Sequence, residues 1–200
     1  MKNFILFCLG LFIFSCSDTG KTSSSQNTNS LEQIDQEKAD YLAKAQDIAT
    51  QAQQALGEQL KTKLEQGGPL NALDYCAVNA IPLTDSLSKT HNIQIRRVTD
   101  KPRNRVNLAE EKEKDYIDFV REQLANAQTP IPVAQLHYDR NLAYIPIITN
   151  PMCLQCHGVP GQDIKDETYN KITQLYSSDR ATGYADAQIR GIWIIEQMKR

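Results

Sequence analysis

Apolar residues recur at helical spacing over two long stretches in the first half of the chain, which predicts two amphipathic helices. The first is expected to begin at Ser30 with a capping-box pattern and to end at Gly67-Gly68-Pro69. The second follows directly, and Pro82 is expected to kink or break it after Asn79. Small residues at the centre of its apolar face would let a flat group approach closely. That face consists of Leu73, Cys76, Ala77, Ala80, Thr84 and Leu87.

The second half of the chain alternates between strand-like and helix-like patterns. Asp139-Arg140-Asn141 separates the two middle strands and predicts a hairpin. The order of elements predicts an α+β fold, with helices packed on an antiparallel sheet. Strands are expected over residues 93–98, 133–138, 142–148 and 189–196, and helices over residues 109–126 and 163–175.

The first residues of the chain have the pattern of an export signal. A short positive start is followed by an apolar run over residues 4–14 and by Ser15-Cys16, and the run is too short for a membrane-spanning helix. Because the junction resembles a bacterial lipoprotein processing site, we expect residues 1–15 to be a signal peptide and Cys16 to carry a lipid. An uncleaved membrane anchor is the alternative. Both interpretations place the rest of the protein outside the cytoplasm, in the periplasm or on the cell surface, next to a membrane.

Residues 16–29 are polar and lack an apolar period, which predicts a flexible tether that leads into a folded domain over residues 30–200. The formal net charge of −2 gives no basic footprint, so no nucleic-acid partner is expected. Cys8 would be removed with the signal peptide and Cys16 would be lipidated. The thiols left in the domain are Cys76, Cys153 and Cys156.

Cys153-Leu154-Gln155-Cys156-His157 is a C-x-x-C-H sequence, the attachment motif for a c-type haem. The spacing suits this chemistry, because one short turn lets Cys153 and Cys156 each form a thioether bond with one vinyl group of the porphyrin. His157 follows directly and can donate a ring nitrogen to the iron. The motif therefore predicts one covalently bound haem.

Two other kinds of site also use a C-x-x-C pair. A zinc site would need two more ligands, and the remaining cysteines and histidines are scattered singly. His137, for example, falls on the more polar face of its strand and is not chosen as a ligand. A redox dithiol usually starts a helix after a strand, whereas Pro151 and Pro160 predict a loop around the motif. Export favours haem attachment over both alternatives.

Further candidates lie outside the motif. Cys76 faces inward beside the alanines, and it is either a buried thiol that acts as a small hydrophobic residue or an iron ligand opposite His157. Arg97 and the cations of residues 99–108 either bind haem propionates through paired hydrogen bonds or form a solvated basic loop. Gly191 within the last strand predicts the close approach of another group, such as the macrocycle.

Other motifs are spread through the domain in a fixed order. They are Ala72-Leu73-Asp74-Tyr75-Cys76 followed by Pro82, Arg97-Val98-Thr99, Arg103-Asn104 with Asn107, Ile145-Pro146-Ile147 leading to C-x-x-C-H, Asp179-Arg180-Ala181-Thr182-Gly183-Tyr184 and Ile189-Arg190-Gly191. Together, from about Leu42 to Glu196, they resemble a family of extracytoplasmic single-haem domains, long catalogued as a domain of unknown function. Members occur alone or as the input part of membrane histidine kinases.

The resemblance implies a PAS-like fold, with a long N-terminal helix, around one c-type haem. It also implies that His157 and Cys76 are the axial ligands of the iron. Arg97, Arg103 and Asn104 are then expected contacts of the cofactor. Arg105 occupies a place that proline often holds in the family, which leaves the contacts of this loop open.

This ligand pair bears on function. A thiolate ligand would stabilise ferric over ferrous haem, which predicts a low reduction potential. With both axial positions filled, no site is open for oxygen or peroxide, so we expect no enzyme activity. Reduction can weaken the Fe–S bond and free a site for a gas such as NO or CO, as in a redox or gas sensor that signals to a protein partner. A low-potential electron carrier and a peroxidase-like enzyme are the alternatives. The sensor is favoured because the family includes kinase input domains.

Overall fold

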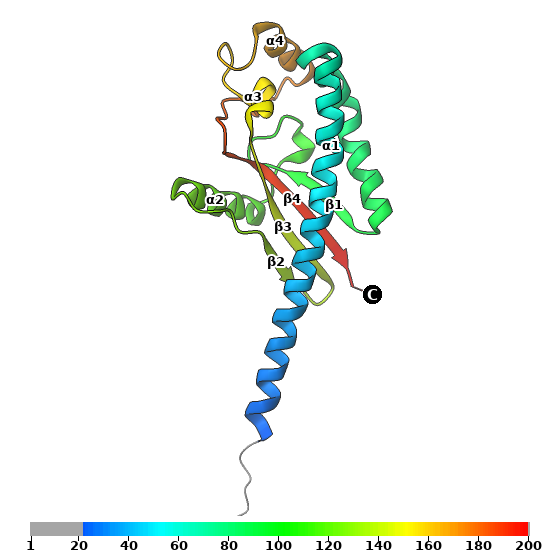
Figure 1. Cartoon of the computed structure of the whole chain (residues 1–200), viewed down its shortest axis with the longest axis vertical. Helices are drawn as coiled ribbons and strands as arrows, with labels where there is room; N and C mark the ends of the chain where they lie inside the picture. Colours follow the sequence, from blue (N-terminus) through cyan, green and yellow to red (C-terminus); the bar gives the residue numbers. More distant parts are fainter. Residues whose placement is uncertain (1–21, 200) are drawn as a thin grey trace, which may run out of the picture. The chain divides into compact units, whose positions relative to one another are not determined.

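A four-stranded antiparallel sheet forms the centre of the molecule (Figure 1). The computed structural model describes the backbone of residues 22–199 and the side chains of residues 30–199. Across the sheet, the strand order is β1 (Gln94–Val98), β4 (Ile189–Met198), β3 (Arg140–Ile148) and β2 (Val133–Leu136). β2 and β3 form the expected hairpin, with a bond of 2.8 Å from the His137 N–H to the Arg140 carbonyl. The predicted α+β class and antiparallel sheet are confirmed.

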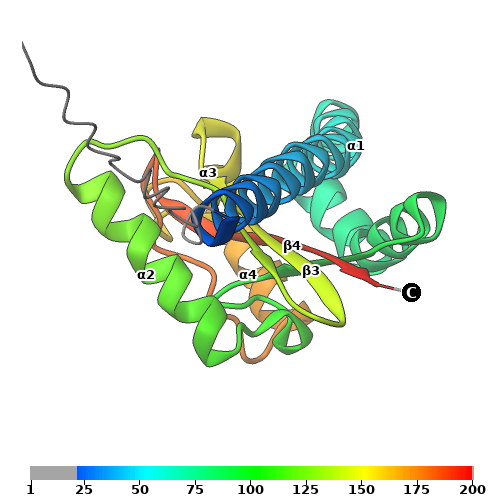
Figure 2. The same cartoon turned by 90° about the horizontal axis from the view of Figure 1, so that it is seen from below.

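Each face of the sheet is covered by a helix, and β4 contributes to both interfaces because side chains alternate along a strand. Ile192 and Ile194 pack against α2 (Glu111–Ala125), whereas Trp193 and Ile195 pack against α1 (Thr22–His91). Figure 2 shows the two helices on either side of β3 and β4. The buried apolar residues that these two helices pack against the sheet are Tyr41, Ala45, Ile48, Ala49 and Ala52 of α1, and Tyr116, Ile117 and Val120 of α2.

Two glycines divide α1 into two helical stretches, as the sequence predicted. Gly67 and Gly68 leave the helical conformation, and Gly68 has φ = +68°, which glycine adopts at little cost. The chain turns back at this point (Figure 1). The second stretch therefore starts from Pro69, which fits the first turn of a helix.

The expected break at Pro82 is wrong, because α1 continues to His91 with no departure from helical geometry at this residue. Proline removes one helical hydrogen bond, here to the carbonyl of Val78. Pro82 and Val78 are both exposed, so water can satisfy that carbonyl.

The C-x-x-C-H motif is helical instead of lying in a loop. It forms α3 (Pro151–His157), which Asn150 caps by accepting a hydrogen bond of 3.3 Å from the Cys153 N–H. Pro151 occupies the first helical turn, where its missing N–H costs nothing. The proline that predicted a loop therefore starts a helix. α4 (Asp166–Leu175) follows.

The N-terminal assignments are tested only in part. α1 begins at Thr22, so residues 22–29 are helical, although their sequence pattern has no apolar period. Extending a helix that is already nucleated costs little per residue, even for polar side chains. The predicted signal peptide (residues 1–15) and the predicted lipidation site Cys16 lie outside the described residues. Within residues 22–199, no helix has the length and hydrophobicity needed to cross a bilayer.

Candidate functional site

A cavity lies between both stretches of α1, the helix α3 and one end of the sheet. Its volume is about 1510 Å³ when the part open to solvent is included. Much of the wall is apolar and formed by α1, with Leu56, Leu60 and Leu64 before the glycine break and the small residues Ala77 and Ala80 after it. All residues that the sequence analysis assigned to a cofactor line this cavity, namely Cys76, Arg97, Arg103, Asn104, Cys153, Cys156 and His157.

The two cysteines of α3 are one helical turn apart and line the cavity as free thiols. Burial raises the pKa of the Cys156 thiol to about 11, against the opposing effect of Arg103. Cys156 also packs on a small apolar cluster that joins α4 to the second stretch of α1, formed by Leu73, Ile164 and Ile172. This packing anchors α3 to α4 and to the second stretch of α1.

The His157 ring is fixed by the carbonyl of Ala181. His157 Nδ1 lies 2.7 Å from this oxygen, and a carbonyl can only accept, so Nδ1 carries the proton and Nε2 keeps its lone pair. Burial, followed by the charges of Arg190 and Arg103, lowers the pKa of His157 well below its usual value. A neutral imidazole with Nδ1–H bonded to a carbonyl is the usual arrangement of a metal-ligating histidine.

Cys76 lies on the second stretch of α1 and is half-buried at the cavity wall. Burial raises the pKa of its thiol, and the positive charges of Arg97 and Arg103 oppose this shift. Cys76 and His157 thus reach one cavity from different elements. The cavity side of α1, rather than the packed core, is the environment of Cys76.

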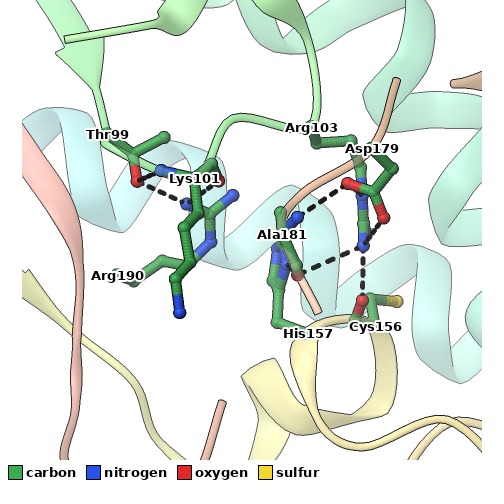
Figure 3. Close-up of polar contacts among 8 residues, drawn as sticks. All are labelled: Thr99, Lys101, Arg103, Cys156, His157, Asp179, Ala181 and Arg190. Carbon is green, nitrogen blue, oxygen red and sulfur yellow. Dashed lines mark hydrogen bonds and ion pairs between the residues drawn. The ribbon is translucent and has the colours of Figure 1, made fainter. Parts of the chain in front are cut away.

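Arg103 is engaged by the protein itself (Figure 3). Its Nη2 donates to the Cys156 carbonyl at 2.7 Å and to Asp179 Oδ2 at 3.2 Å, and its Nε donates to Asp179 Oδ1 at 3.2 Å. Asn104 caps the short helix η1 (Arg105–Asn107), because its Oδ1 accepts from the Val106 N–H at 3.2 Å. Both residues line the cavity. The contacts of Arg103 join its loop to α3 and to Asp179, and the contact of Asn104 stabilises the start of η1.

Arg190 lines the cavity and was not among the predicted site residues. Its Nη1 donates to Thr99 Oγ1 at 3.2 Å, and its guanidinium lies 5.4 Å from the Tyr184 ring centroid. Arg190 Nε and the Tyr184 hydroxyl are buried without a hydrogen-bond partner among the described residues, which is uncommon enough to need an explanation. The signal that could have identified Arg190 is a lone cation in an otherwise apolar strand.

The family model described as Tll0287-like (Tll0287) matches residues 26–197 of the chain.

The chain belongs to the Tll0287-like family.

A similar solved structure is the crystal structure of the cyanobacterial heme-protein Tll0287, with 19% sequence identity and a TM-score of 0.61. The match covers 80% of this chain and 96% of that chain, so the two proteins share their fold. No curated protein matches this chain.

One sequence-based interpretation of this Tll0287-like chain changes with the structure. The glycine at position 191 is required by the sheet, because a Cβ there would lie 2.5 Å from the Val98 carbonyl oxygen of β1. The macrocycle is therefore not needed to explain Gly191.

Among the described residues, no group of three His, Cys, Asp or Glu side chains could hold a metal ion.

Proposed function

We propose that this protein carries one covalently attached c-type haem, with thioether bonds to Cys153 and Cys156 and with His157 and Cys76 as the iron ligands. The observation that carries this proposal is that these four side chains line one cavity. In thioether formation each thiol adds across a vinyl group, so a C–S bond forms and the proton goes to the second vinyl carbon. No oxidant or reductant is needed for this step.

The chain's own groups fit such a cofactor. Small side chains on α1 allow a planar group to approach, and the neutral His157 offers Nε2. Arg97 lines the cavity with its guanidinium 5.8 Å from the Trp193 ring centroid, and Arg190 adds a buried Nε that lacks a partner. These two arginines are better candidates for propionate contacts than Arg103, whose Nε and Nη2 are already bonded. The haem, when bound, supplies one-electron chemistry.

We infer that the protein is a redox or gas sensor. Cys76 belongs to α1, the helix whose first stretch covers the sheet. Loss of the Cys76 bond on reduction would open a site for NO or CO and would free the second stretch of α1 to shift about the Gly67–Gly68 break. This chain would then act through a separate protein partner. A single-haem electron carrier is the second candidate, supported by a cavity that opens to solvent.

The location is also a proposal. Removal of residues 1–15 and lipidation of Cys16 would anchor the domain to a bacterial membrane, on its extracytoplasmic side. Metabolic labelling with a tagged fatty acid tests this, since Cys16→Ser should abolish incorporation and Cys8→Ser should not once the signal peptide is cleaved.

The decisive experiment is spectroscopy of the protein exported from a host that matures c-type cytochromes. We expect the mass of one haem, a Soret band that survives acid–acetone extraction, and a low-spin ferric spectrum. Cys76→Ala should convert the ferric haem to a different ligation state and raise the midpoint potential, because the thiolate no longer stabilises ferric iron.

Met152→Ala is the matched control, since Met152 is another sulfur-bearing residue that lines the cavity. If Met152→Ala changes the spectrum and Cys76→Ala does not, Cys76 is not the ligand. If the purified protein has no haem mass, the proposal is wrong as a whole.

The role is tested on the ferrous protein. Carbon monoxide binding, with faster amide exchange over residues 70–80 of α1, supports the sensor. Rapid electron exchange with a reductase, without gas binding, supports the carrier. Because Cys76 and His157 would fill both axial positions, we expect negligible peroxidase turnover in the wild-type protein.

A further inference from the structure

We propose that Arg103 and Asp179 are positioning residues for His157: acting through the peptide of Ala181, they set how strongly His157 binds iron. This inference rests on the haem function proposed above. It assigns to Arg103 a role other than the propionate contact expected from the sequence, and it adds Asp179, which that analysis did not select.

The contacts form one continuous network (Figure 3). The Ala181 carbonyl accepts the His157 Nδ1 hydrogen bond at 2.7 Å and also lies 3.4 Å from Arg103 Nη2. On the same residue, the Ala181 N–H donates to Asp179 Oδ1 at 3.0 Å. Ala181 is therefore held through both its N–H and its carbonyl. The same Arg103 Nη2 reaches the carbonyl of Cys156, the residue before His157, at 2.7 Å.

The backbone adds two further ties between the same segments. The Tyr184 N–H donates to the His157 carbonyl at 3.0 Å, and the Gly183 N–H donates to the Gly158 carbonyl at 2.8 Å. Residues 179–184 thus run along the end of α3 as a strap. Within this strap, only the Ala181 carbonyl bonds the imidazole ring itself.

The ion pair is well shielded from water. The side chains of Arg103 and Asp179 are 11% and 7% exposed. Little water therefore competes for the hydrogen bonds between them, which favours a single geometry of the pair. Charge-assisted, two-point contacts between Arg and a carboxylate are among the stronger hydrogen bonds in proteins. Such a pair can hold a carbonyl in place better than a loop backbone alone.

The consequence falls on the ligand. A group that accepts a hydrogen bond from the ring nitrogen that does not bind the metal orients the imidazole and raises its basicity. Loss of such a group commonly costs 10–100-fold in metal affinity or activity. A more basic His157 favours ferric iron. Asp179 also supplies the negative charge that balances Arg103. Removing that charge leaves an uncompensated cation near the site, which further disfavours the ferric state.

The test compares Asp179→Asn with Asp186→Asn in the haem-loaded protein. Both variants remove one carboxylate from the segment between α4 and β4, but Asp186 is exposed, and its carboxylate accepts a hydrogen bond from the N–H of its neighbour Ala187. We expect Asp179→Asn to shift the ferric–ferrous equilibrium about tenfold toward ferrous, which is about +59 mV for a one-electron couple. The ferric electron paramagnetic resonance g values should change as well. Asp186→Asn should leave both unchanged.

A purely structural role makes a different prediction. Asp179→Asn would then lower the melting temperature while its midpoint potential and g values matched those of Asp186→Asn, and the proposal would be overturned.

Arg103→Lys, compared with Arg105→Lys on the same loop, decides the matter if Asp179→Asn does not fold. Lysine keeps the charge but cannot make the paired contacts of the guanidinium, so we expect a smaller positive shift in potential for Arg103→Lys and none for the exposed Arg105→Lys. Equal potentials in this pair overturn the proposal. Failure of the haem function shows instead as a wild-type protein without haem.

Discussion

Adjacent arginines on β1 end in different surroundings because successive side chains point to opposite faces of a strand. Arg96 Nη2 bonds Glu113 Oε1 of α2 at 2.7 Å, whereas Arg97 lies over the Trp193 ring and lines the cavity. Burial lowers the pKa of Arg97, and nearby Cys76 opposes this shift. Arg97 is therefore a cation that the cavity keeps close to the Cys76 thiol.

This contrast gives a paired prediction. Arg97→Gln should lower the midpoint potential of the haem-loaded protein, because loss of a positive charge beside the site favours ferric iron, and stability should change little. Arg96→Gln should leave the potential alone but lower the free energy of unfolding by about 2 kcal/mol, since the buried Glu113 carboxylate loses its partner. Redox titration measures the first effect and urea unfolding the second. A change in potential with Arg96→Gln but not with Arg97→Gln would contradict the strand register.

Gly191 allows a second residue-scale prediction. A Cβ at this position would lie 2.5 Å from a backbone oxygen, so Gly191→Ala should lower the free energy of unfolding by about 3 kcal/mol. Gly57 lies inside α1 with nothing within 4 Å of an added Cβ. Gly57→Ala should therefore raise the free energy of unfolding by about 1 kcal/mol. Both are measured by urea unfolding of the haem-free protein. A destabilised Gly57→Ala would show that this part of α1 has little room.

Where local spacing decides a residue's position, the sequence could predict it. Cys153, Cys156 and His157 lie within about one turn of α3, and all three line the cavity. The contacts of Arg103 could not be predicted, because its partner Asp179 is 76 positions away and no periodicity links the two. Arg190 carries one sequence signal, a lone cation in an apolar strand, but its contact with Thr99, 91 positions away, could not be predicted either.

At the scale of elements, the effect of glycine and proline on the helices was predicted correctly only where the residue's own backbone conformation determines the outcome. Gly68 adopts φ > 0, and the break in α1 follows from that alone. A proline can end a helix, lie inside one or start one, depending on its exposure and its position in the turn. Pro82 lies inside α1, and Pro151 starts α3. Both facts depend on tertiary packing, which a pattern of residue types does not contain.

The packing of α1 on the sheet is tested through a tyrosine. The Tyr41 hydroxyl lies 2.9 Å from the Ile195 carbonyl oxygen and 3.0 Å from that of Asn141. Tyr41→Phe should therefore lower the free energy of unfolding by about 1 kcal/mol at neutral pH. Tyr138→Phe is the matched control, because Tyr138 is fully exposed and its change should have no effect.

The same tyrosine gives a pH dependence. Burial, followed by the charge of Glu196, raises the pKa of Tyr41 above its usual value, and burial also raises that of Tyr116. The folded state thus keeps protons that the unfolded state releases above a pH of about 10, so stability is full below that pH and falls as the pH rises beyond it. Tyr41→Phe should make this alkaline fall shallower in unfolding measurements. An unchanged slope would mean that Tyr41 ionises as easily in the folded protein.

For the whole molecule, residues 37–199 carry the core described here. They belong to one compact unit, which begins at Glu37. Among the side chains that the structure describes, Tyr41 is the first buried residue of α1. A cleavable signal peptide fused directly to Glu37 should give a chain with an unchanged melting temperature and haem content. The same signal peptide fused to Gln46 should give a chain that loses at least about 3 kcal/mol of stability, because Tyr41 and Ala45 are then missing from the core. Equal stability of the two truncations would place the boundary elsewhere.

The sheet order has a consequence for biosynthesis. Within the described residues, β4 follows the other strands in the chain and is the only strand paired with β1, and it also pairs with β3. A nascent polypeptide that ends before residue 189 therefore cannot complete this sheet. Such a chain stays incompletely folded until β4 has been synthesised. Premature stop codons at positions 189–197 should accordingly yield proteolysed fragments and no shortened, folded product.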